Sequence, residues 1–199
     1  MDPAPSRKQL THDRILDAAA RALRETGFHG VGVADIMKRA GLTHGGFYAH
    51  FPSRDALIVE ALQRAGEDSQ GRLQRSMAAG EARAGSRFRA LVESYLSETH
   101  LKAADRGCPV AALLSDVPRQ SDAVRAAAGD RIASLIARVA AALGPDAPPD
   151  AAAIVASQMV GALQIARALG DNALGRRHLA SNRRFLLERF DAGAAREAR

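Results

Sequence analysis

The stretch VADIMKRAGLTHGGFYAHFPSRDAL, residues 33–57, contains two short helical patterns separated by a glycine turn. Its first part places apolar residues at the i, i+3, i+4 and i+7 positions of an amphipathic helix: Val33, Ile36, Met37 and Ala40. Gly41 is expected to end this helix, because glycine readily adopts the left-handed backbone conformation of a helix terminus. A second short helix is expected from His44 to His50, with Thr43 as its N-cap. A helix, a glycine turn and a helix in this order predict a helix-turn-helix.

The second helix of the motif should present different residues to the domain core and to the outside. Phe47 and Phe51 are one helical turn apart and should both face inward. The residues expected to face DNA lie on the opposite side of the motif or beside it: Lys38, Thr43, His44, Gly45, Gly46, Tyr48, His50 and Arg54. Gly45 and Gly46 lack side chains and would let the backbone approach the sugar-phosphate chain closely. The alternative is a three-helix packing unit with a solvated basic face.

Arg54 is the one member of this set that lies in the next helix, for which Ser53 should be the N-cap. A cation in the first turn of a helix is unfavourable, because the helix dipole is positive there. A DNA phosphate at this position would compensate the charge, and the free amide groups of the helix start would bind the same phosphate. We therefore expect Arg54 to contact the DNA backbone.

The composition favours an all-α fold of about nine helices. The chain has 199 residues, no tryptophan and 4% aromatic residues, which is unlike a β-sandwich. Its formal net charge of +6 fits a nucleic acid partner without establishing one. The single cysteine, Cys108, excludes an internal disulfide and fits a reducing cytoplasm. The apolar run 151–169 contains Gln158, Gln164 and Arg167, so we interpret it as a buried helix and expect no membrane span.

The helical patterns divide the chain into a small N-terminal and a larger C-terminal domain. We expect a flexible basic arm at residues 1–9, a helix-turn-helix domain at residues 10–55, a larger C-terminal helical domain at residues 56–191, and a frayed tail at residues 192–199. The helices are expected at about 11–26, 33–40, 44–50, 54–77, 88–104, 109–116, 122–143, 150–169 and 174–190. Gly66 and Gly71 each cost the fourth helix about 1 kcal/mol relative to alanine and would make it a pliable connection between the domains. Residues Gly80–Gly85 are expected to form a loop.

Two segments, ILDAAARALRETGFHG at residues 15–30 and VADIMKRAGLTHGGFYAHFPSRDALIVEAL at residues 33–62, resemble the TetR/AcrR family of transcriptional regulators. The resemblance implies an all-α homodimer that binds double-stranded operator DNA and responds to a small-molecule effector, with no cofactor or metal. It also implies that the helical domain at residues 56–191 is the ligand-binding and dimerisation domain, and that its last two helices, at 150–169 and 174–190, form the dimer interface. Within the motif it places one set of side chains at the DNA: Thr43, His44, Gly45, Tyr48 and His50, with Arg54 at a phosphate.

The sequence departs from the family pattern at two places. Gly32 and Val33 stand where the family often has Thr or Ser as a helix cap and phosphate contact. Ala49 follows the tyrosine of the second motif helix, where a bulky residue is common. The base preference of a relative therefore does not transfer to this chain.

A ligand pocket among the C-terminal helices would combine apolar and polar side chains. Its candidate lining residues are Phe88, Tyr95, His100, Cys108, Leu113, Gln158 and Met159. The alternative for the apolar members is an ordinary place in the hydrophobic core. Cys108 precedes Pro109 at an expected helix start, where a thiolate would be stabilised, so redox sensing by this residue is a further hypothesis.

The sequence thus predicts a ligand-responsive transcriptional regulator, a repressor that a small molecule releases from a palindromic operator. One competing class is an enzyme that uses Cys108 with His100 or His178. The sequence has no nucleophile elbow, phosphate-binding loop or metal-ligand spacing to support it, so no catalytic activity is expected. The other competing class is a nonspecific architectural DNA binder, which would show salt dependence without sequence preference.

Overall fold

The computed structural model describes residues 5–191 and, within them, only the backbone of residues 80–84. This part of the chain consists of helices and loops and contains no strand, which confirms the predicted all-α fold. The described α-helices are α1 (Arg7–Thr26), α2 (Val33–Arg39), α3 (Arg54–Ala84), α4 (Arg87–Tyr95), α5 (Glu98–Lys102), α6 (Pro109–Leu113), α7 (Asp122–Leu143), α8 (Ala151–Leu169) and α9 (Ala173–Phe190). Four 3-10 helices join them: η1 (Phe28–Gly30), η2 (His44–Ala49), η3 (Ala104–Arg106) and η4 (Val117–Arg119).

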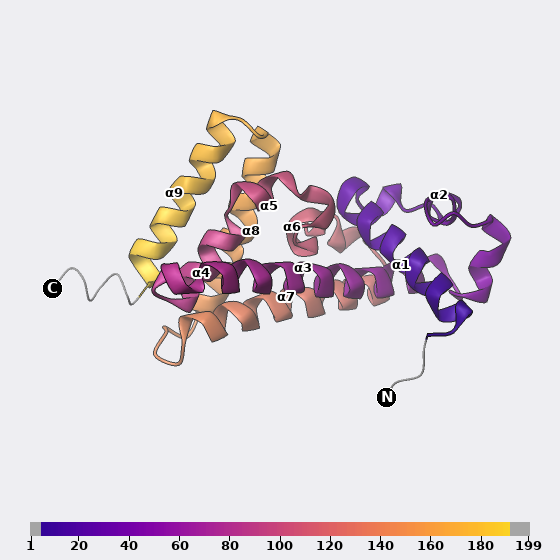
Figure 1. Ribbon diagram of the computed structural model, residues 1–199, viewed down its shortest axis with the longest axis horizontal. Helices are drawn as coiled ribbons and strands as arrows, with labels where there is room; N and C mark the ends of the chain where they lie inside the picture. Colours follow the sequence, from indigo (N-terminus) through magenta and orange to yellow (C-terminus); the bar gives the residue numbers. More distant parts are fainter. Residues whose placement is uncertain (1–4, 192–199) are drawn as a thin grey trace.

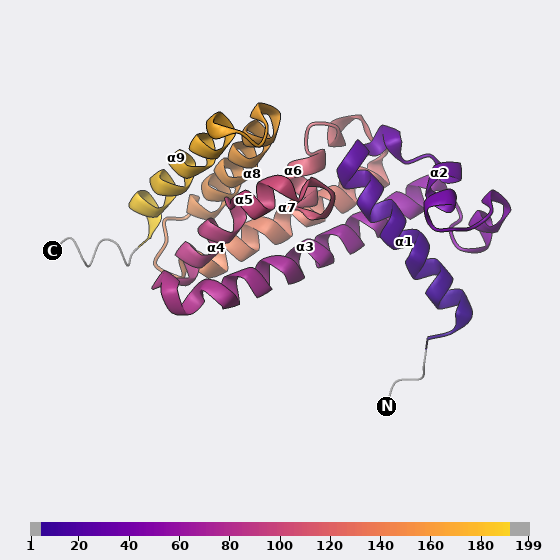
Figure 2. The same cartoon turned by 45° about the horizontal axis from the view of Figure 1, so that its top comes forward.

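The molecule is elongated, with the helix-turn-helix at one end and the α8–α9 hairpin at the other (Figure 1). The helix α3 runs from the first end towards the second and packs against α1, α4 and α7 (Figure 2). It has 31 residues, which corresponds to a length of about 45 Å. One rigid element therefore joins the motif directly to the C-terminal helices.

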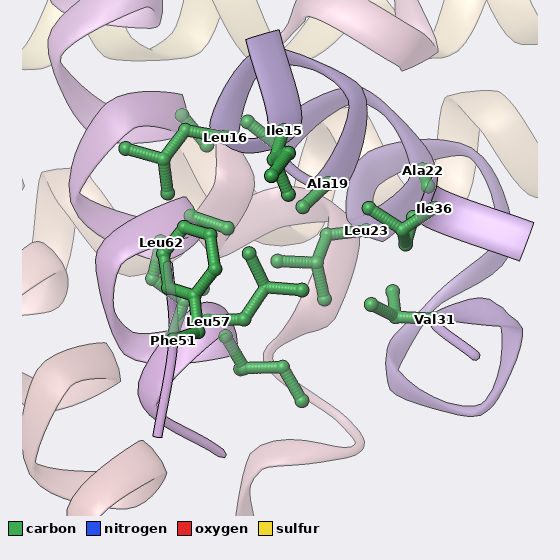
Figure 3. Packing of buried hydrophobic residues seen from close by; sticks show 14 of the residues in the cluster. Ile15, Leu16, Ala19, Ala22, Leu23, Val31, Ile36, Phe51, Leu57 and Leu62 are labelled. Atoms are coloured by element: carbon green, nitrogen blue, oxygen red, sulfur yellow. The ribbon is translucent and has the colours of Figure 1, made fainter. Parts of the chain in front are cut away.

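The N-terminal helices are held together by a continuous apolar core. Side chains of α1, α2 and α3 converge there, as Figure 3 shows for Ile15, Leu23, Ile36, Phe51 and Leu57. These five are completely buried, and burial of one such side chain stabilises the fold by about 1.5–3 kcal/mol. The same core extends to residues of α6 and α7: Leu113, Val124 and Ala128. The division of the chain at residue 55 stays a prediction, since apolar contacts continue across it.

The helix α3 is longer than predicted. It continues through Gly66 and Gly71 to Ala84, so the predicted end near Met77 and the predicted loop at Gly80–Gly85 are both wrong. Gly85 ends it with a φ of +73°, in the left-handed region. A Cβ atom at Gly66 would lie only 2.8 Å from Cδ of Arg131, so the glycine there lets α7 pack closely on α3.

The helix α1 begins one turn before the predicted start at Thr11. Ser6 is its N-cap, and the Ser6 hydroxyl accepts a hydrogen bond from the amide of Gln9 at 3.2 Å. The flexible arm predicted at residues 1–9 is therefore wrong for residues 7–9, which are helical. The remainder of that arm at residues 1–4 and the predicted tail at 192–199 lie outside the described residues.

The helix predicted at 88–104 is two helices, α4 and α5. Leu96 leaves the helical conformation, and Ser97 caps α5 by accepting a hydrogen bond from the amide of His100 at 3.1 Å. The next helix, α6, ends at Leu113 and does not reach the predicted residue 116. The hydrogen bond from a serine side chain to the backbone competes with the helical hydrogen bonds, and here it ends the predicted helix and starts a new one.

The helix α8 packs along α9 and forms one side of the C-terminal core (Figure 1). Its mean hydropathy of 1.4 and its 19 residues would suffice for a membrane span by composition and length alone. Within this fold 39% of that segment is buried. Eight residues of α8 are buried, but Ile154 and Ile165 are more than half exposed, so the helix predicted to be buried has one open face in the single chain.

Candidate functional site

The glycine turn of the motif has the predicted geometry. Gly41 has a φ of +68°, in the left-handed region that favours glycine. The amide of Gly41 donates to the carbonyl oxygen of Lys38 at 2.9 Å, and the amide of Leu42 donates to that of Met37 at 2.8 Å. These bonds satisfy carbonyl groups at the end of α2, so the chain turns there and enters η2.

The segment after the turn is a 3-10 helix, which corrects the predicted α-helix from His44 to His50. Its bonds join residues three apart, with the amide of Gly46 donating to Thr43 at 3.2 Å and that of His50 donating to Phe47 at 2.9 Å. Thr43 is the N-cap by position, but its side chain makes no capping bond within the described chain. The two adjacent glycines each cost an α-helix about 1 kcal/mol relative to alanine, which favours the tighter conformation.

The two faces of η2 divide as predicted. Phe47 and Phe51 are both 0% exposed, and their ring centroids lie 5.8 Å apart in the core. Tyr48, the neighbour of Phe47, is 71% exposed. A tyrosine this exposed beside a buried phenylalanine contributes little to the core, so it is available to a partner.

The residues predicted to face DNA all lie between Lys38 and Arg54, and each is exposed or half-buried. The exposed ones are Lys38, Thr43, His44, Gly45 and Tyr48. The half-buried ones are Gly46, His50 and Arg54. They come from the end of α2, from η2 and its flanks, and from the first residue of α3. Their contact with DNA stays a prediction.

The packing of the chain does not require glycine at position 45. A Cβ atom there would have no atom within 4 Å, whereas at Gly46 it would lie 3.6 Å from Cε of Met37. Both positions have negative φ, so the backbone does not select glycine either. The absence of a side chain at Gly45 is thus consistent with a close approach by a partner from outside.

Arg54 has partners inside its own domain. Its Nε donates to the carbonyl oxygen of Val31 at 2.9 Å, and its Nη2 donates to that of Phe28. These two carbonyl groups and the nearby Asp55 stabilise the cation without a phosphate, and the contact of Arg54 with the DNA backbone stays a prediction. The arginine fixes the loop between α1 and α2 against the start of α3, and thereby positions the motif.

Sequence reasoning also missed a cluster of histidines behind the DNA-facing surface. The ring of His12 in α1 stacks on Phe51 at a centroid distance of 4.4 Å, and its Nε2 lies 2.9 Å from a carboxylate oxygen of Glu60. The adjacent His50 has a buried Nδ1 atom with no hydrogen-bond partner among the described residues. Burial lowers the pKa of His50, and the positive charges of His12 and Lys8 add to this effect. His50 is therefore only partly available to DNA.

Arg39 does not contribute a free charge to the outer face of α2. It bonds to Asp35 and to Glu25, each at 2.8 Å, and these hydrogen bonds raise its pKa. The spacing of Asp35 and Arg39, one helical turn apart, was a signal for the first of these contacts. Lys38 is thus the exposed basic residue of α2 that has no ion pair among residues 5–191.

The predicted pocket residues do not form one site. A cavity of about 310 Å³ lies between α3, α4, α5 and the loop that follows them, and of the predicted residues only Tyr95 and His100 line it. Phe88 and Met159 belong to the core, as the alternative held. Leu113 packs in the N-terminal core, which extends to α6 and α7. The remaining two also lie elsewhere: Cys108 is buried at the start of α6, and Gln158 bonds to Asn182 of α9 at 3.3 Å.

His100 holds together the wall of this cavity. Its Nδ1 donates to the carbonyl oxygen of Tyr95 at 2.7 Å, and its Nε2 accepts from the amide of Cys108 at 3.0 Å. Both nitrogens of the neutral His100 ring therefore already have hydrogen-bond partners within the fold. Burial lowers the pKa of His100 to about 4, so the ring stays neutral at physiological pH.

A model of the family described as bacterial regulatory proteins, tetR family, matches residues 15–61. The chain is 29% identical over 175 residues to an uncharacterised HTH-type transcriptional regulator of Mycobacterium tuberculosis, covering 82% of this chain and 87% of that protein. Together these matches support a TetR-family regulator. It is also 26% identical over 133 residues to the HTH-type transcriptional repressor NemR of Escherichia coli, covering 67% of each chain. A TetR-family regulator of Agrobacterium tumefaciens has the same fold, with a TM-score of 0.72 and 21% identity over 92% of this chain and 98% of that one.

The findings support a DNA-binding transcriptional regulator, and the TetR family, whose members act as dimers, is not enzymatic. The enzyme hypothesis is therefore wrong. The structure supplies a physical reason, because both ring nitrogens of His100 already hold the backbone and neither faces Cys108 as a free base. The predicted family was confirmed, and the surface of the motif is the candidate nucleic-acid interface.

Proposed function

We propose that the protein is a repressor that binds a palindromic operator as a homodimer in the cytoplasm and is released by a small molecule. The observation that carries the DNA-binding part is the exposure of Tyr48 next to the buried Phe47. This arrangement presents Thr43, His44 and Tyr48 on the side of η2 away from the core. Such a short helical segment fits the major groove, where side chains can reach base edges.

The α8–α9 hairpin supports the homodimer. Large apolar side chains that are more than half exposed gather on these two helices: Ile154, Ile165, Leu174 and Phe185. Ile154 and Ile165 are three helical turns apart and share one face of α8, with Gly161 between them. Exposed apolar residues on a common face indicate a protein interface, and a glycine lets two helices approach closely. We therefore assign the dimer contact to α8 and α9.

The release by a small molecule is supported by the cavity beside α3. The helix α3 begins at Arg54, beside the motif, and also carries the cavity residue Leu73. If α3 can take two positions, a ligand that binds the protein more tightly in one of them favours that position and thereby shifts the orientation of the motif. The name of NemR as a repressor supports the same direction of regulation. Gly66 and Gly71 lie on α3 between the motif and most of the cavity lining, so their proposed role in this coupling stays a prediction.

The residues of η2 are tested by binding to an inverted repeat from the DNA upstream of the protein's own gene. We expect His44→Ala and Tyr48→Ala each to weaken operator binding by about tenfold or more, because a good base or phosphate contact contributes about 1–3 kcal/mol. Gel shifts with the operator and with unrelated DNA of equal length provide the measurement.

The dimer should stay intact in both variants, because η2 carries both residues and follows α2, which lies at the opposite end of the molecule from α8 and α9 (Figure 1). Equal binding of the wild type to operator and unrelated DNA, with a steep salt dependence, would instead support the nonspecific architectural binder. A loss of dimerisation in His44→Ala would contradict the assignment of the dimer contact.

A further inference from the structure

The cavity beside α3 combines an apolar lining with hydroxyl groups and the guanidinium groups of two arginines, Arg72 and Arg106. Leu73 and Ala90 contribute apolar surface, and Ser69, Ser76 and Ser94 contribute hydroxyls. Arg72 lies on the same face of α3 as Ser69 and Ser76. The cavity volume of about 310 Å³ suits a small organic molecule. The chemistry of the lining therefore favours a ligand with an apolar body and a polar head.

The charges next to the cavity are not balanced. Asp68 is shared by two arginines, with Nη2 of Arg24 at 3.6 Å and Nη2 of Arg72 at 3.9 Å from the same oxygen. The third arginine, Arg106, pairs with Asp105 at 3.2 Å. Three guanidinium groups thus meet two carboxylates. The Nη2 atom of Arg72 is buried and has no hydrogen-bond partner within the described chain.

The inner wall of the cavity is backed by two more arginines. Arg167 donates from Nη2 to the carbonyl oxygen of His100 at 2.9 Å, and Arg138 donates to the side chain of Gln70 at 2.9 Å. Neither has a carboxylate within ion-pair distance among the described residues, and burial lowers the pKa of both. A Cβ atom at Gly107, which lines the cavity, would lie 2.5 Å from Nη2 of Arg167. Positive charge therefore lies directly behind the wall.

One acidic residue, Glu93, also lines the cavity. It lies on α4, and its carboxylate is 4.0 Å from Nη1 of Arg89. Arg89 in turn binds Asp191 at 2.9 Å. Arg89 with Glu93 and Asp191 thus adds one guanidinium and two carboxylates, so the excess positive charge around the cavity comes from Arg138 and Arg167 behind its wall.

We propose that the effector is an amphipathic organic anion, whose acidic group binds Arg72 and whose apolar body lies against Leu73 and Ala90. This inference rests on the proposed function, because it names the ligand class of the effector cavity. An anionic group supplies what the surrounding residues lack, a partner for the unbonded Nη2 atom of Arg72 and for the excess guanidinium charge.

The same contact connects the cavity to the DNA-binding end. Arg24 belongs to α1 and is only 6% exposed, and its Nη1 donates to the carbonyl oxygen of Ala65 in α3 at 3.1 Å. Its carboxylate partner, Asp68, is the one shared with Arg72. An anion that draws Arg72 away leaves Asp68 to Arg24 alone. The packing of α1 on α3 then differs between the free and the liganded protein, which biases the position of the motif.

The ligand class is tested by calorimetry on the dimer without DNA, with octanoate, octanamide and octylamine as probes of equal chain length. We expect octanoate to bind and the neutral and cationic probes to bind at least tenfold more weakly. Arg72→Gln should weaken octanoate by about tenfold or more, since a hydrogen bond to a charged group contributes at least that factor. Arg75→Gln, an exposed arginine of α3 outside the cavity lining, is the matched control and should leave binding unchanged.

The variant Asp68→Asn distinguishes anion binding at Arg72 from the effect of that binding on operator affinity. It removes the carboxylate that competes for Arg72, so octanoate should bind this variant as tightly as the wild type or more tightly. Release of the operator by octanoate should nevertheless be reduced by about tenfold, because the contact of Asp68 with Arg24 is lost.

Three results would overturn the anionic class: equal binding of octanamide or octylamine, unchanged binding by Arg72→Gln, or no binding of hexanoate, octanoate or decanoate at about 1 mM. Wild-type operator release by octanoate with full release also in Asp68→Asn would overturn the coupling through Arg24. Specific octanoate binding at Arg72 without any effect on operator affinity would confirm the site and contradict the proposed ligand-released repressor. The two failures are therefore distinguishable.

Discussion

Ile165→Glu is expected to convert the dimer into a monomer and to lower operator affinity by about a hundredfold or more. Ile165 is 51% exposed on the face of α8 that also carries Ile154. In an interface with twofold symmetry the substitution introduces a carboxylate in each subunit, and each would be buried without a partner at a cost of several kcal/mol. A monomer binds one half-site alone and loses the gain of simultaneous binding, which is about 10²–10⁴ in affinity. Sedimentation velocity and fluorescence anisotropy with a labelled palindrome measure the two effects.

The matched control is Ala137→Glu, which adds the same carboxylate to an exposed position of α7. It should stay dimeric and bind the operator as the wild type does. A single half-site should bind Ile165→Glu and the wild type with equal affinity, because the motif is unchanged. A stable Ile165→Glu dimer would remove α8 from the interface and leave the proposed assembly without its main support.

The helix-turn-helix could be predicted because its signals are local. The apolar spacing from Val33 to Ala40 and the glycine at position 41 fix α2 and its end within a few residues of chain. The spacing of Phe47 and Phe51, four residues apart, likewise predicts the buried face of η2. The type of helix was missed at η2, because the preference of two adjacent glycines against an α-helix outweighed the surrounding pattern.

The arginine contacts could not be predicted because their partners lie far away in the sequence. Arg54 bonds to carbonyl groups of the loop before α2, and Arg24 bonds across to α3. Backbone carbonyl groups are present at every residue, so no sequence pattern marks which one an arginine will reach. Arg54 looked unfavourable at a helix start only while its partners were unknown, and the contacts show it as a support of the motif.

The cavity between α3, α4 and α5 contains only two of the residues predicted for a ligand pocket, Tyr95 and His100. Phe88 and Tyr95 have the same apolar spacing on α4, yet the first packs in the core and the second also borders the cavity. Which buried residue borders an empty space depends on how several helices meet, and that is not encoded in one helix. The break between α4 and α5 at Ser97 changed that arrangement further, because it turned His100 back onto Tyr95.

Acid is expected to destabilise the protein through His100, by about 3 kcal/mol between pH 7 and pH 4. The pKa of His100 is lowered to about 4 by burial, against an ordinary value of 6.5. Between these values the unfolded chain binds a proton that the folded chain does not, so the free energy of unfolding falls as the pH falls from about 6.5 to 4. Each pH unit of that window contributes about 1.4 kcal/mol. Urea unfolding followed by helical circular dichroism measures it, since the chain has no tryptophan.

His100→Gln should remove this part of the pH dependence. A glutamine amide can donate to the carbonyl oxygen of Tyr95 and accept from the amide of Cys108, but it does not titrate. The variant should be less stable than the wild type at pH 7, because the ring packing against Tyr95 is lost, and the difference should shrink or reverse by pH 4. His29→Gln, at an exposed position, is the control and should follow the wild type at equal protein concentration. Parallel pH profiles of wild type and His100→Gln would show that protonation of His100 does not limit acid stability, and would leave the ring with a packing role alone.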